Sequence, residues 1–247
     1  MEVNIKELLE VGAYFGHPSR QFDSRIKPYI FGKRQGIYII DIEKTVDKIY
    51  RASEFIKIII MQNKEILFVG TKKQSQNIVK ELGEKTGQPY VNYRWIGGTL
   101  TNFDILKKRI SRLDEIEKLE QSGEINYYTK KEISLILKEK NNLLKKFGGI
   151  RYMHRLPSSI IIVDTRKETN AVNEARKKGI PIVGIVDTNG NPDIIDYPIP
   201  ANDDGYKSIQ LVLSKLSESI MEAKNEKEII EKAKNIEEEN VQPNRTN

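Results

Sequence analysis

The sequence predicts an α/β fold in which helices cover both faces of a parallel sheet. Two short, continuously apolar segments, ILFVG at 66–70 and SIIIVD at 159–164, have the composition of strands that are buried on both faces. A third, IPIVGIVDT at 180–188, follows a segment with helical spacing of its apolar residues. Buried strands that alternate with helices are typical of a parallel sheet.

The N-terminal part is predicted to form a short helix and then an arm. Residues 4–11 have the apolar spacing of a helix, and residues 14–42 contain two prolines, three glycines and a strand-like segment at 37–40. Because glycine and proline interrupt regular elements, this pattern favours an arm with a hairpin over a packed helix layer. Apolar residues then recur at helical spacing across 43–62, which predicts a long helix.

The remaining units of the α/β domain follow from the same patterns. Glycine commonly follows the last turn of a helix, so Gly83 and Gly179 mark two expected helix ends. The further predicted elements are a helix at 72–83, a strand at 90–95, a helix at 168–178, a short strand at 197–201 and a last helix at 206–223.

Residues 103–147 depart from this alternation. They contain two long helical patterns, separated by QSGEINYYT, and each pattern has a narrow apolar seam with charge elsewhere. A narrow seam favours an antiparallel coiled-coil hairpin that projects from the domain, and the alternative is two ordinary domain helices. The expected seam residues are Leu106, Ile110, Leu113, Ile116, Leu119, Ile133, Ile136, Leu137, Leu144 and Phe147.

These patterns divide the chain into three parts. Residues 1–102 and 148–224 are predicted to form the α/β globular domain, which includes the basic arm at 14–42. Residues 103–147 form the inserted hairpin. Residues 225–247 are polar and are predicted to be a disordered tail.

Composition limits the classes of function. The 247 residues include no cysteine, which excludes disulfides, thiolate metal sites and cysteine nucleophiles. No apolar segment approaches the length of a membrane span, and the N-terminus lacks the pattern of a secretion signal. The net charge of +6 and the bases of the arm suggest a polyanionic partner, and a solvated basic surface is the alternative.

The motifs of common enzymes are missing. Gly70-Thr71-Lys72-Lys73 follows a strand, but the second glycine of a P-loop is absent, and no G-x-G triplet of a dinucleotide site occurs. The two histidines are His17 in the arm and His154 in the basic segment RYMHR. Nothing in the sequence indicates catalysis, and we assign no catalytic residues, no cofactor and no small-molecule substrate.

Acidic residues follow two neighbouring strands, and they allow two interpretations. Asp187, Asp193, Asp203 and Asp204 could converge at the carboxyl edge of the sheet, where oxygen ligands hold hard cations. Asx residues beside glycine and proline also form turns, and Asn202 or Asp203 can cap the final helix. We favour turns and capping, and we assign no metal site.

The segment RWIGGTLTNF, at 94–103, resembles a phosphate-binding turn without having the spacing of one. Arg94 can pair with a phosphate, and Thr99 and Asn102 carry further donors. We expect Trp95 to be buried, because a side chain of this size usually is.

Several long blocks, taken together, resemble one known family. They are YFGHPSRQFDSRIKPYIFGKRQGIYIIDIEKT (14–45), ILFVGTKKQ (66–74), VNYRWIGGTLTNF (91–103), FGGIRYMHRLP (147–157) and GIPIVGIVDTNGNPDIIDYPIPANDD (179–204). The resemblance is to the bacterial-type small-ribosomal-subunit proteins that carry the number two, and it runs from about Ile5 to Ala223. Pro18 and the pair His154-Arg155 depart from the family's pattern.

The resemblance implies a three-layer, flavodoxin-like α/β fold with an inserted helical hairpin. It implies a structural protein that is not an enzyme. Its partners would be small-subunit rRNA and other small-subunit proteins, including the large OB-repeat ribosomal protein, which the family helps to anchor near the mRNA exit in support of initiation. We expect no membrane association and no homo-oligomer. We expect a cytoplasmic bacterial ribosome rather than an organellar one.

Bases on loops and helix surfaces are the candidate RNA contacts, because such groups neutralise phosphates with little base specificity. The competing hypotheses are a metal-dependent small-molecule enzyme that uses the acidic sheet edge, and a protein-interaction module that uses the hairpin. The candidate RNA-binding residues are Arg20, Arg25, Lys27, Lys33, Arg34, Lys72, Lys73, Arg94, Thr99, Asn102, Lys107, Lys108, Arg109, Arg112, Arg151, His154 and Arg155.

Overall fold

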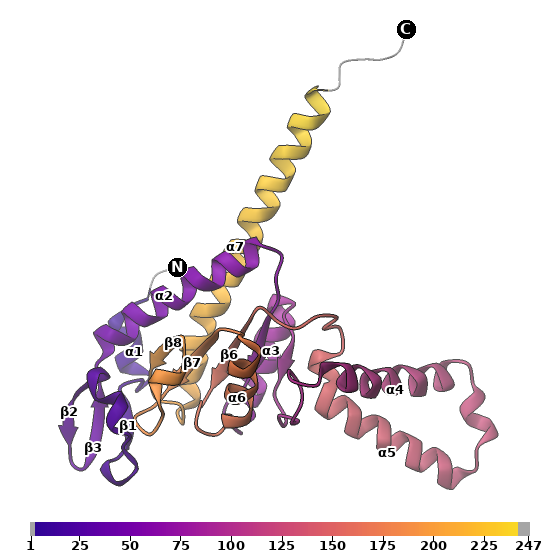
Figure 1. Cartoon of the computed structure of the whole chain (residues 1–247), viewed down its shortest axis with the longest axis horizontal. Helices are drawn as coiled ribbons and strands as arrows, with labels where there is room; N and C mark the ends of the chain where they lie inside the picture. Colours follow the sequence, from indigo (N-terminus) through magenta and orange to yellow (C-terminus); the bar gives the residue numbers. More distant parts are fainter. Residues whose placement is uncertain (1–2, 242–247) are drawn as a thin grey trace.

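A five-stranded parallel sheet forms the centre of the protein (Figure 1). The structure is a computed structural model that describes the backbone of residues 3–241 and the side chains of residues 3–233. The sheet has the strand order β5-β4-β6-β7-β8, and every neighbouring pair is parallel. Its strands are β4 (Ile66–Val69), β5 (Tyr90–Val91), β6 (Ser159–Val163), β7 (Ile182–Val186) and β8 (Tyr197–Pro200).

The central strands are apolar throughout because both faces of the sheet are covered. Successive side chains alternate between the two faces, so Ile66 and Phe68 pack into one core cluster while Leu67 and Val69 pack into the other. All residues of β4, β6 and β7 are buried. The parallel α/β sheet flanked by helices is therefore confirmed, and its strand order is that of a flavodoxin-like fold.

Helices cover the two faces unequally. The core cluster on one face draws residues from α1 (Ile5–Glu10), α2 (Ile42–Met61), α3 (Gln76–Thr86) and α7 (Tyr206–Val241). The other face carries α6 (Thr169–Lys178), together with residues from the start of α4 and the turn that precedes it.

The N-terminal segment forms a second, small sheet beside the main one (Figure 1). It contains β1 (Phe15–Pro18), β2 (Ile30–Arg34) and β3 (Ile37–Ile40), which pair antiparallel in the order β1-β3-β2. Thr188, after β7, fixes its position: its Oγ1 accepts a hydrogen bond from the His17 amide at 2.7 Å, and its carbonyl accepts one from the Asp23 amide at 3.0 Å.

Two helices run out from the domain as a pair (Figure 1). They are α4 (Phe103–Gln121) and α5 (Lys130–Phe147). Thr129 and Glu132 form a capping box at the start of α5, which explains its sharp beginning. Of the expected seam residues, Leu113 is fully buried and Leu137 is 37% exposed. A coiled coil stays a prediction.

Two expected helix ends are corrected. The helix α3 passes through Gly83 and ends at Gly87, which adopts the left-handed conformation with φ 61°. Gly83 lies inside the helix because a Cβ there would collide with the Tyr90 ring. The last helix does not end at Ala223 but continues to Val241, because residues 224–241 contain neither glycine nor proline and are rich in helix formers. Disorder from residue 225 is therefore wrong as far as 241, and residues 242–247 lie outside the described part of the chain.

Candidate functional site

The strand order reverses between β4 and β6, and this is the place where open α/β sheets bind ligands. Here the chain itself supplies a cation at the crevice. The ammonium of Lys72, just after β4, lies 3.0 Å from Asp164 Oδ2, 2.7 Å from Asp203 Oδ1 and 2.6 Å from Asp204 Oδ1. The Lys72 side chain is only 13% exposed, so its charge is committed to these three carboxylates.

His17 connects the small N-terminal sheet to the same network. Its Nδ1 lies 3.1 Å from Asp187 Oδ1 and its Nε2 lies 3.1 Å from Asp204 Oδ2. Asp187 in turn accepts a hydrogen bond from the Asp203 amide. Ligand atoms of His17, Asp187 and Asp203 lie within 4.8 Å of one another, a grouping with the chemistry to hold a metal ion.

Both interpretations of the acidic residues, convergence at the sheet edge and the formation of turns, are therefore correct in part. Asp187, Asp203 and Asp204 do meet, whereas Asp193 lies exposed at a short turn of its own. Asn202 forms the turn before α7, as the favoured interpretation predicts, because its Oδ1 accepts hydrogen bonds from the Asp204 and Gly205 amides.

Proton affinities in this network follow from burial and from close charges. Burial works against the charged Lys72 ammonium, but attraction to Asp203, Asp204 and Asp164 outweighs it and raises the Lys72 pKa. Burial, together with repulsion by Asp187 and Asp164, raises the pKa of Asp203 to about 7 despite the opposing effect of Lys72. The close Asp187 carboxylate raises the pKa of His17 against the effect of burial.

A second buried carboxylate closes the crevice next to Lys72. Glu168 Oε1 accepts hydrogen bonds from both the backbone amide and the hydroxyl of Thr71. Burial raises the Glu168 pKa although these hydrogen bonds oppose it. Asp164 has a positive φ of 62°, a conformation that costs energy in a non-glycine residue. The crevice is thus shaped by contacts that the chain makes with itself.

The glycine turn after β5 also has an internal anion. The Glu174 carboxylate of α6 accepts hydrogen bonds from the Trp95 indole, the amides of Gly98, Leu100 and Thr101, and the Thr101 hydroxyl. Burial opposes ionisation of Glu174, but these donors outweigh it and lower its pKa. The resemblance to a phosphate-binding turn has a physical basis, and the anion that the turn binds belongs to this protein.

This arrangement separates the three candidates in the turn. Thr99 is buried and its hydroxyl donates to the Ile96 carbonyl, so Thr99 does not fit the role of an RNA contact. Arg94 and Asn102 are exposed. Trp95 is buried, as expected, with 7% exposure.

Several of the other candidate bases have internal partners. Arg112 pairs with Glu115 and Glu139 on the hairpin, which ties α4 to α5. Arg151 pairs with Asp114 and Glu117, and these carboxylates raise its pKa in spite of burial. With Lys72, these are the candidates whose charge is already balanced within the protein.

Arg25 and Arg155 have partners but stay accessible. Arg25 is exposed while it pairs with Asp23, and Arg155 is exposed while it donates to the Asn63 carbonyl.

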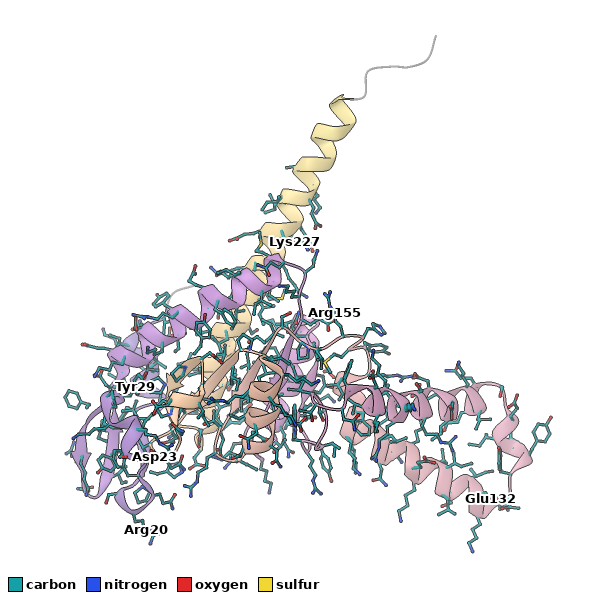
Figure 2. All side chains as sticks on the ribbon, viewed as in Figure 1. Arg20, Asp23, Tyr29, Glu132, Arg155 and Lys227 are labelled. Atoms are coloured by element: carbon teal, nitrogen blue, oxygen red, sulfur yellow. The ribbon has the colours of Figure 1, made fainter. Side chains whose placement is uncertain are left out.

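The remaining candidates are exposed and form no ion pair with a described residue. Arg20 lies at the end of the small sheet, far from the helical hairpin (Figure 2). The set comprises Arg20, Lys27, Lys33, Arg34, Lys73, Arg94, Lys107, Lys108, Arg109 and His154.

Sequence reasoning missed the roles of Lys72, His17 and Glu174. The ion pairs of Lys72 could have been predicted from its position in the sequence. A lysine directly after a central strand lies at the same edge of the sheet as the acidic residues that follow β6, β7 and β8. No sequence pattern indicated the role of Glu174, since it is one of many acidic residues in predicted helices and lies 79 residues from its indole donor.

The fold and the site together define a class of protein: a flavodoxin-like α/β protein whose usual ligand crevice is filled by its own ion pairs, and whose free positive charge lies on an arm, loops and a helical pair. Among the described residues, every helix is too short or too polar to span a lipid bilayer.

Residues 8–223 match the sequence model of the family described as ribosomal protein S2, and the chain belongs to this family. The family is structural and not enzymatic, which gives the chain a structural role in the small ribosomal subunit, in translation.

Proposed function

We propose that the chain holds small-subunit rRNA through exposed bases that form no ion pair with a described residue. The observation that carries this proposal is the arm, where Arg20, Lys27, Lys33 and Arg34 are all exposed and form no ion pair with a described residue. Groups of this kind neutralise phosphates and release counterions, so they give an affinity that falls steeply with salt. Lys72, Arg112, Arg151 and Thr99 are not part of the proposed interface. The three bases pair with carboxylates of the chain itself, and the Thr99 hydroxyl donates to a backbone carbonyl.

The helical pair offers a second strip of positive charge. Lys107, Lys108 and Arg109 are exposed on α4, and we propose that they lie along a neighbouring RNA helix. Side chains cannot readily enter the deep groove of A-form RNA, so recognition there relies on shape and phosphate position. The helical pair, tied together by the Arg112–Glu139 ion pair, suits this role because a rigid element fixes the spacing of its charges.

Sedimentation tests the proposal. The tagged chain is expected to comigrate with small subunits at low salt and to leave them as salt rises. Migration at the top of the gradient at every salt concentration would contradict it.

A further part of the proposal concerns the anchoring of the large OB-repeat ribosomal protein. A pocket of about 600 Å³ lies on the small sheet and is lined by Phe15, Phe31, Ile37 and Ile39 among others. Phe31 is 79% exposed, and an exposed apolar patch of this kind supports a protein contact. We propose that this pocket receives the partner.

The variant Phe31→Ala tests this surface. Particles with this variant should contain less of the OB-repeat protein at an unchanged level of the chain itself. The matched control is Tyr127→Ala, because Tyr127 is 90% exposed at the far end of the helical pair. Equal retention of the OB-repeat protein in both variants would refute the assignment of the pocket.

The enzyme hypothesis has one observation in its favour, the grouping of His17, Asp187 and Asp203. Against it, the Lys72 ammonium already balances the carboxylates at this edge. Stabilisation by Mg²⁺ together with a nucleotide would support the enzyme, and we expect none. We also predict that the particle is a cytoplasmic bacterial ribosome and that it contains a single copy of the chain. Mass spectrometry of purified subunits can check the copy number.

A further inference from the structure

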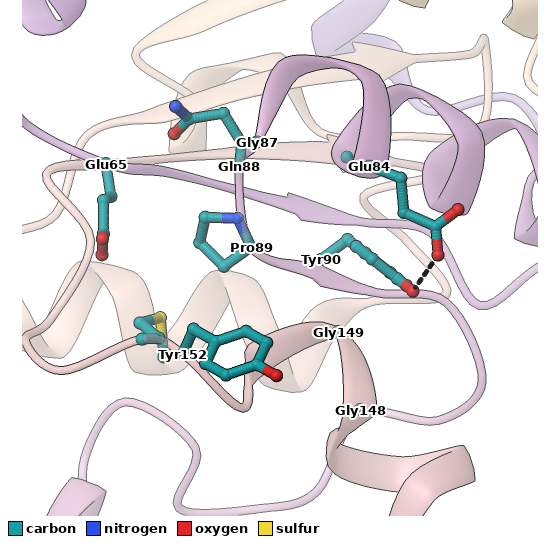
Figure 3. A pocket seen from close by; sticks show the side chains of 11 residues that line it. Glu65, Glu84, Gly87, Gln88, Pro89, Tyr90, Gly148, Gly149 and Tyr152 are labelled. Carbon is teal, nitrogen blue, oxygen red and sulfur yellow. Dashed lines mark hydrogen bonds between the residues drawn. The ribbon is translucent and has the colours of Figure 1, made fainter.

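A small pocket at the opposite edge of the sheet has the features of a nucleobase site (Figure 3). It has a volume of about 280 Å³ and lies where β4 and β5 begin. Its walls come from the end of α3, the start of β5 and the segment after α5. The volume lies just below the range typical of drug-sized ligands, so it suits a single ring system. We name it the Glu65 pocket.

Tyr90 forms a fixed wall of this pocket. Its hydroxyl donates a hydrogen bond to Glu84 Oε1 at 3.0 Å, and burial with the nearby Glu84 charge raises the Tyr90 pKa to about 12. Gly83 and Gly149 pack directly against it, because a Cβ at either position would collide with Tyr90. The wall is therefore rigid and neutral at physiological pH.

Glu65 gives the pocket an unused acceptor. Its Oε2 is buried and has no hydrogen-bond partner among the described residues, although a buried acceptor without a donor costs free energy. The carboxylate points toward the side of the pocket on which Tyr152 lies (Figure 3). Because the terminal torsion of a glutamate is soft, a small rotation can present both oxygens to a ligand. A carboxylate accepts and does not donate, so it selects a ligand edge that carries donors.

The mouth of the pocket carries the groups that hold unpaired RNA. Tyr152 is 76% exposed, and exposed aromatic rings stack on splayed bases. His154 and Arg155 follow it and are exposed. A second pocket of about 310 Å³ shares Tyr90, Gly148 and Gly149 with the first, and it is lined by Tyr93, Lys80 and Lys145. Aromatic rings and positive charges thus continue on both sides of the Gly148–Gly149 segment.

We propose that the Glu65 pocket takes one unpaired guanine of RNA, with its ring on Tyr152 and its Watson–Crick edge on the Glu65 carboxylate. Guanine is the common base that presents two adjacent donors, N1–H and the N2 amino group, to such a carboxylate. Adenine and cytosine each place an acceptor beside their donor, and uracil flanks its single donor with two acceptors. This inference rests on the proposed binding of rRNA and adds a base-specific contact to it.

Chemical probing of reconstituted small subunits tests the inference. Kethoxal modifies the N1 and N2 positions of accessible guanines. We expect one unpaired guanine to be protected with the wild-type chain, and to become at least about tenfold more reactive with Glu65→Gln and with Tyr152→Ala, given the worth of a charged hydrogen bond and of base stacking. Tyr152 is so exposed that its removal leaves the fold intact. The controls are Tyr127→Ala and Glu124→Gln, which alter exposed residues of the short segment that joins α4 to α5.

A direct measurement supplements the probing. The full chain at low salt is titrated with the RNA heptamers UUUGUUU, UUUAUUU and UUUIUUU, where I is inosine, which lacks the N2 amino group. Guanine should bind about tenfold more tightly than inosine or adenine, and Glu65→Gln should remove the difference. Equal binding of the three heptamers, no binding of the guanine heptamer, or an identical kethoxal pattern with all variants overturns the inference. Failure of the wild-type chain to enter the particle would instead refute the proposed function.

Discussion

The carboxyl edge of the sheet and the N-terminal arm both carry dense charge, but the two regions use it in opposite ways. At the sheet edge, Lys72 is 13% exposed and lies within 3.0 Å of carboxylate oxygens of three aspartates. In the arm, Lys33 and Arg34 are exposed and form no ion pair with a described residue. The charge of Lys72 is balanced by carboxylates of the protein itself, whereas these arm charges form no ion pair with a described residue, and we propose that they contact RNA.

This difference shows that the sign of a charge says little about its role until its partners are known. Lys72 and Lys73 are adjacent in the sequence, and both are candidate RNA contacts on that basis alone. The strand β4 delivers Lys72 to the crevice, whereas the next side chain, Lys73, is exposed to solvent.

The largest expected effect comes from Lys72→Met. It leaves Asp203 and Asp164 without their cation, and removal of one partner from a buried pair destabilises a protein by about 3 kcal/mol or more. The matched control is Lys73→Met, which should change stability by less than about 0.5 kcal/mol because Lys73 is exposed. Urea unfolding of both variants measures the difference in stability. Similar free energies of unfolding for the two variants would contradict the assigned role of Lys72.

The second effect is that of Glu174→Gln. The substitution replaces a carboxylate that accepts five hydrogen bonds with an amide that must turn an N–H₂ group toward N–H donors, and it should cost about 2 kcal/mol. Because the folded-state pKa of Glu174 is lowered, its contribution is present above the unfolded value near 4.5 and is lost as pH falls. Fluorescence of Trp95, the single tryptophan, reports unfolding. The exposed Glu81→Gln is the control, and an equal stability of the two variants would be inconsistent with an internal anion.

The third effect is a pH dependence of the edge network. Asp203 has a folded-state pKa of about 7 against an ordinary value of 3.8, so the folded protein binds the proton more strongly than the unfolded chain does. Its contribution to stability is therefore greatest below pH 3.8 and is lost as pH rises to about 7. The raised His17 pKa acts in the same direction, with its contribution lost as pH rises above 6.5 through the folded value.

Thermal and urea unfolding between pH 5 and pH 8 measure this dependence. Stability of the wild-type chain should fall by about 3 kcal/mol across this range, because two pH units separate pH 5 from the Asp203 pKa of about 7 and each corresponds to about 1.4 kcal/mol. In Asp203→Asn the fall should be smaller. A slope that the substitution does not change would argue against proton sharing at this edge.

Much of the fold could be predicted because local signals and packing agree. Buried strands are read from continuous apolar residues, and α6 ends at Gly179, which adopts the left-handed conformation that glycine allows. Prediction failed where a distant contact overrode a local signal. Gly83 resembles a glycine that ends a helix, but the structure places it inside α3, where the absence of a Cβ makes room for the Tyr90 ring. Polar composition after Ala223 suggested a tail, although helix propensity there is high.

The candidate site was predictable only in part. The basic arm is visible from its composition, because five bases lie between Gly16 and Gly36 with one acid. The pairing of Lys72 with residues 92 and 131 positions away, and of Arg151 with α4, depends on the tertiary structure. A local sequence pattern does not show which of two neighbouring charged residues will form a buried ion pair.

The salt dependence of rRNA binding by arm variants tests the central claim most directly. The triple variant Arg20→Gln, Lys33→Gln, Arg34→Gln removes three exposed charges from the arm, and the control Lys6→Gln, Arg51→Gln, Lys207→Gln removes three exposed charges from α1, α2 and α7. Both keep the edge network, so both should unfold like the wild type. The arm variant is expected to bind more weakly and to lower the slope of log K against log salt by about 2, while the control leaves the slope unchanged. An arm variant with the wild-type slope and undiminished assembly into small subunits would contradict the account.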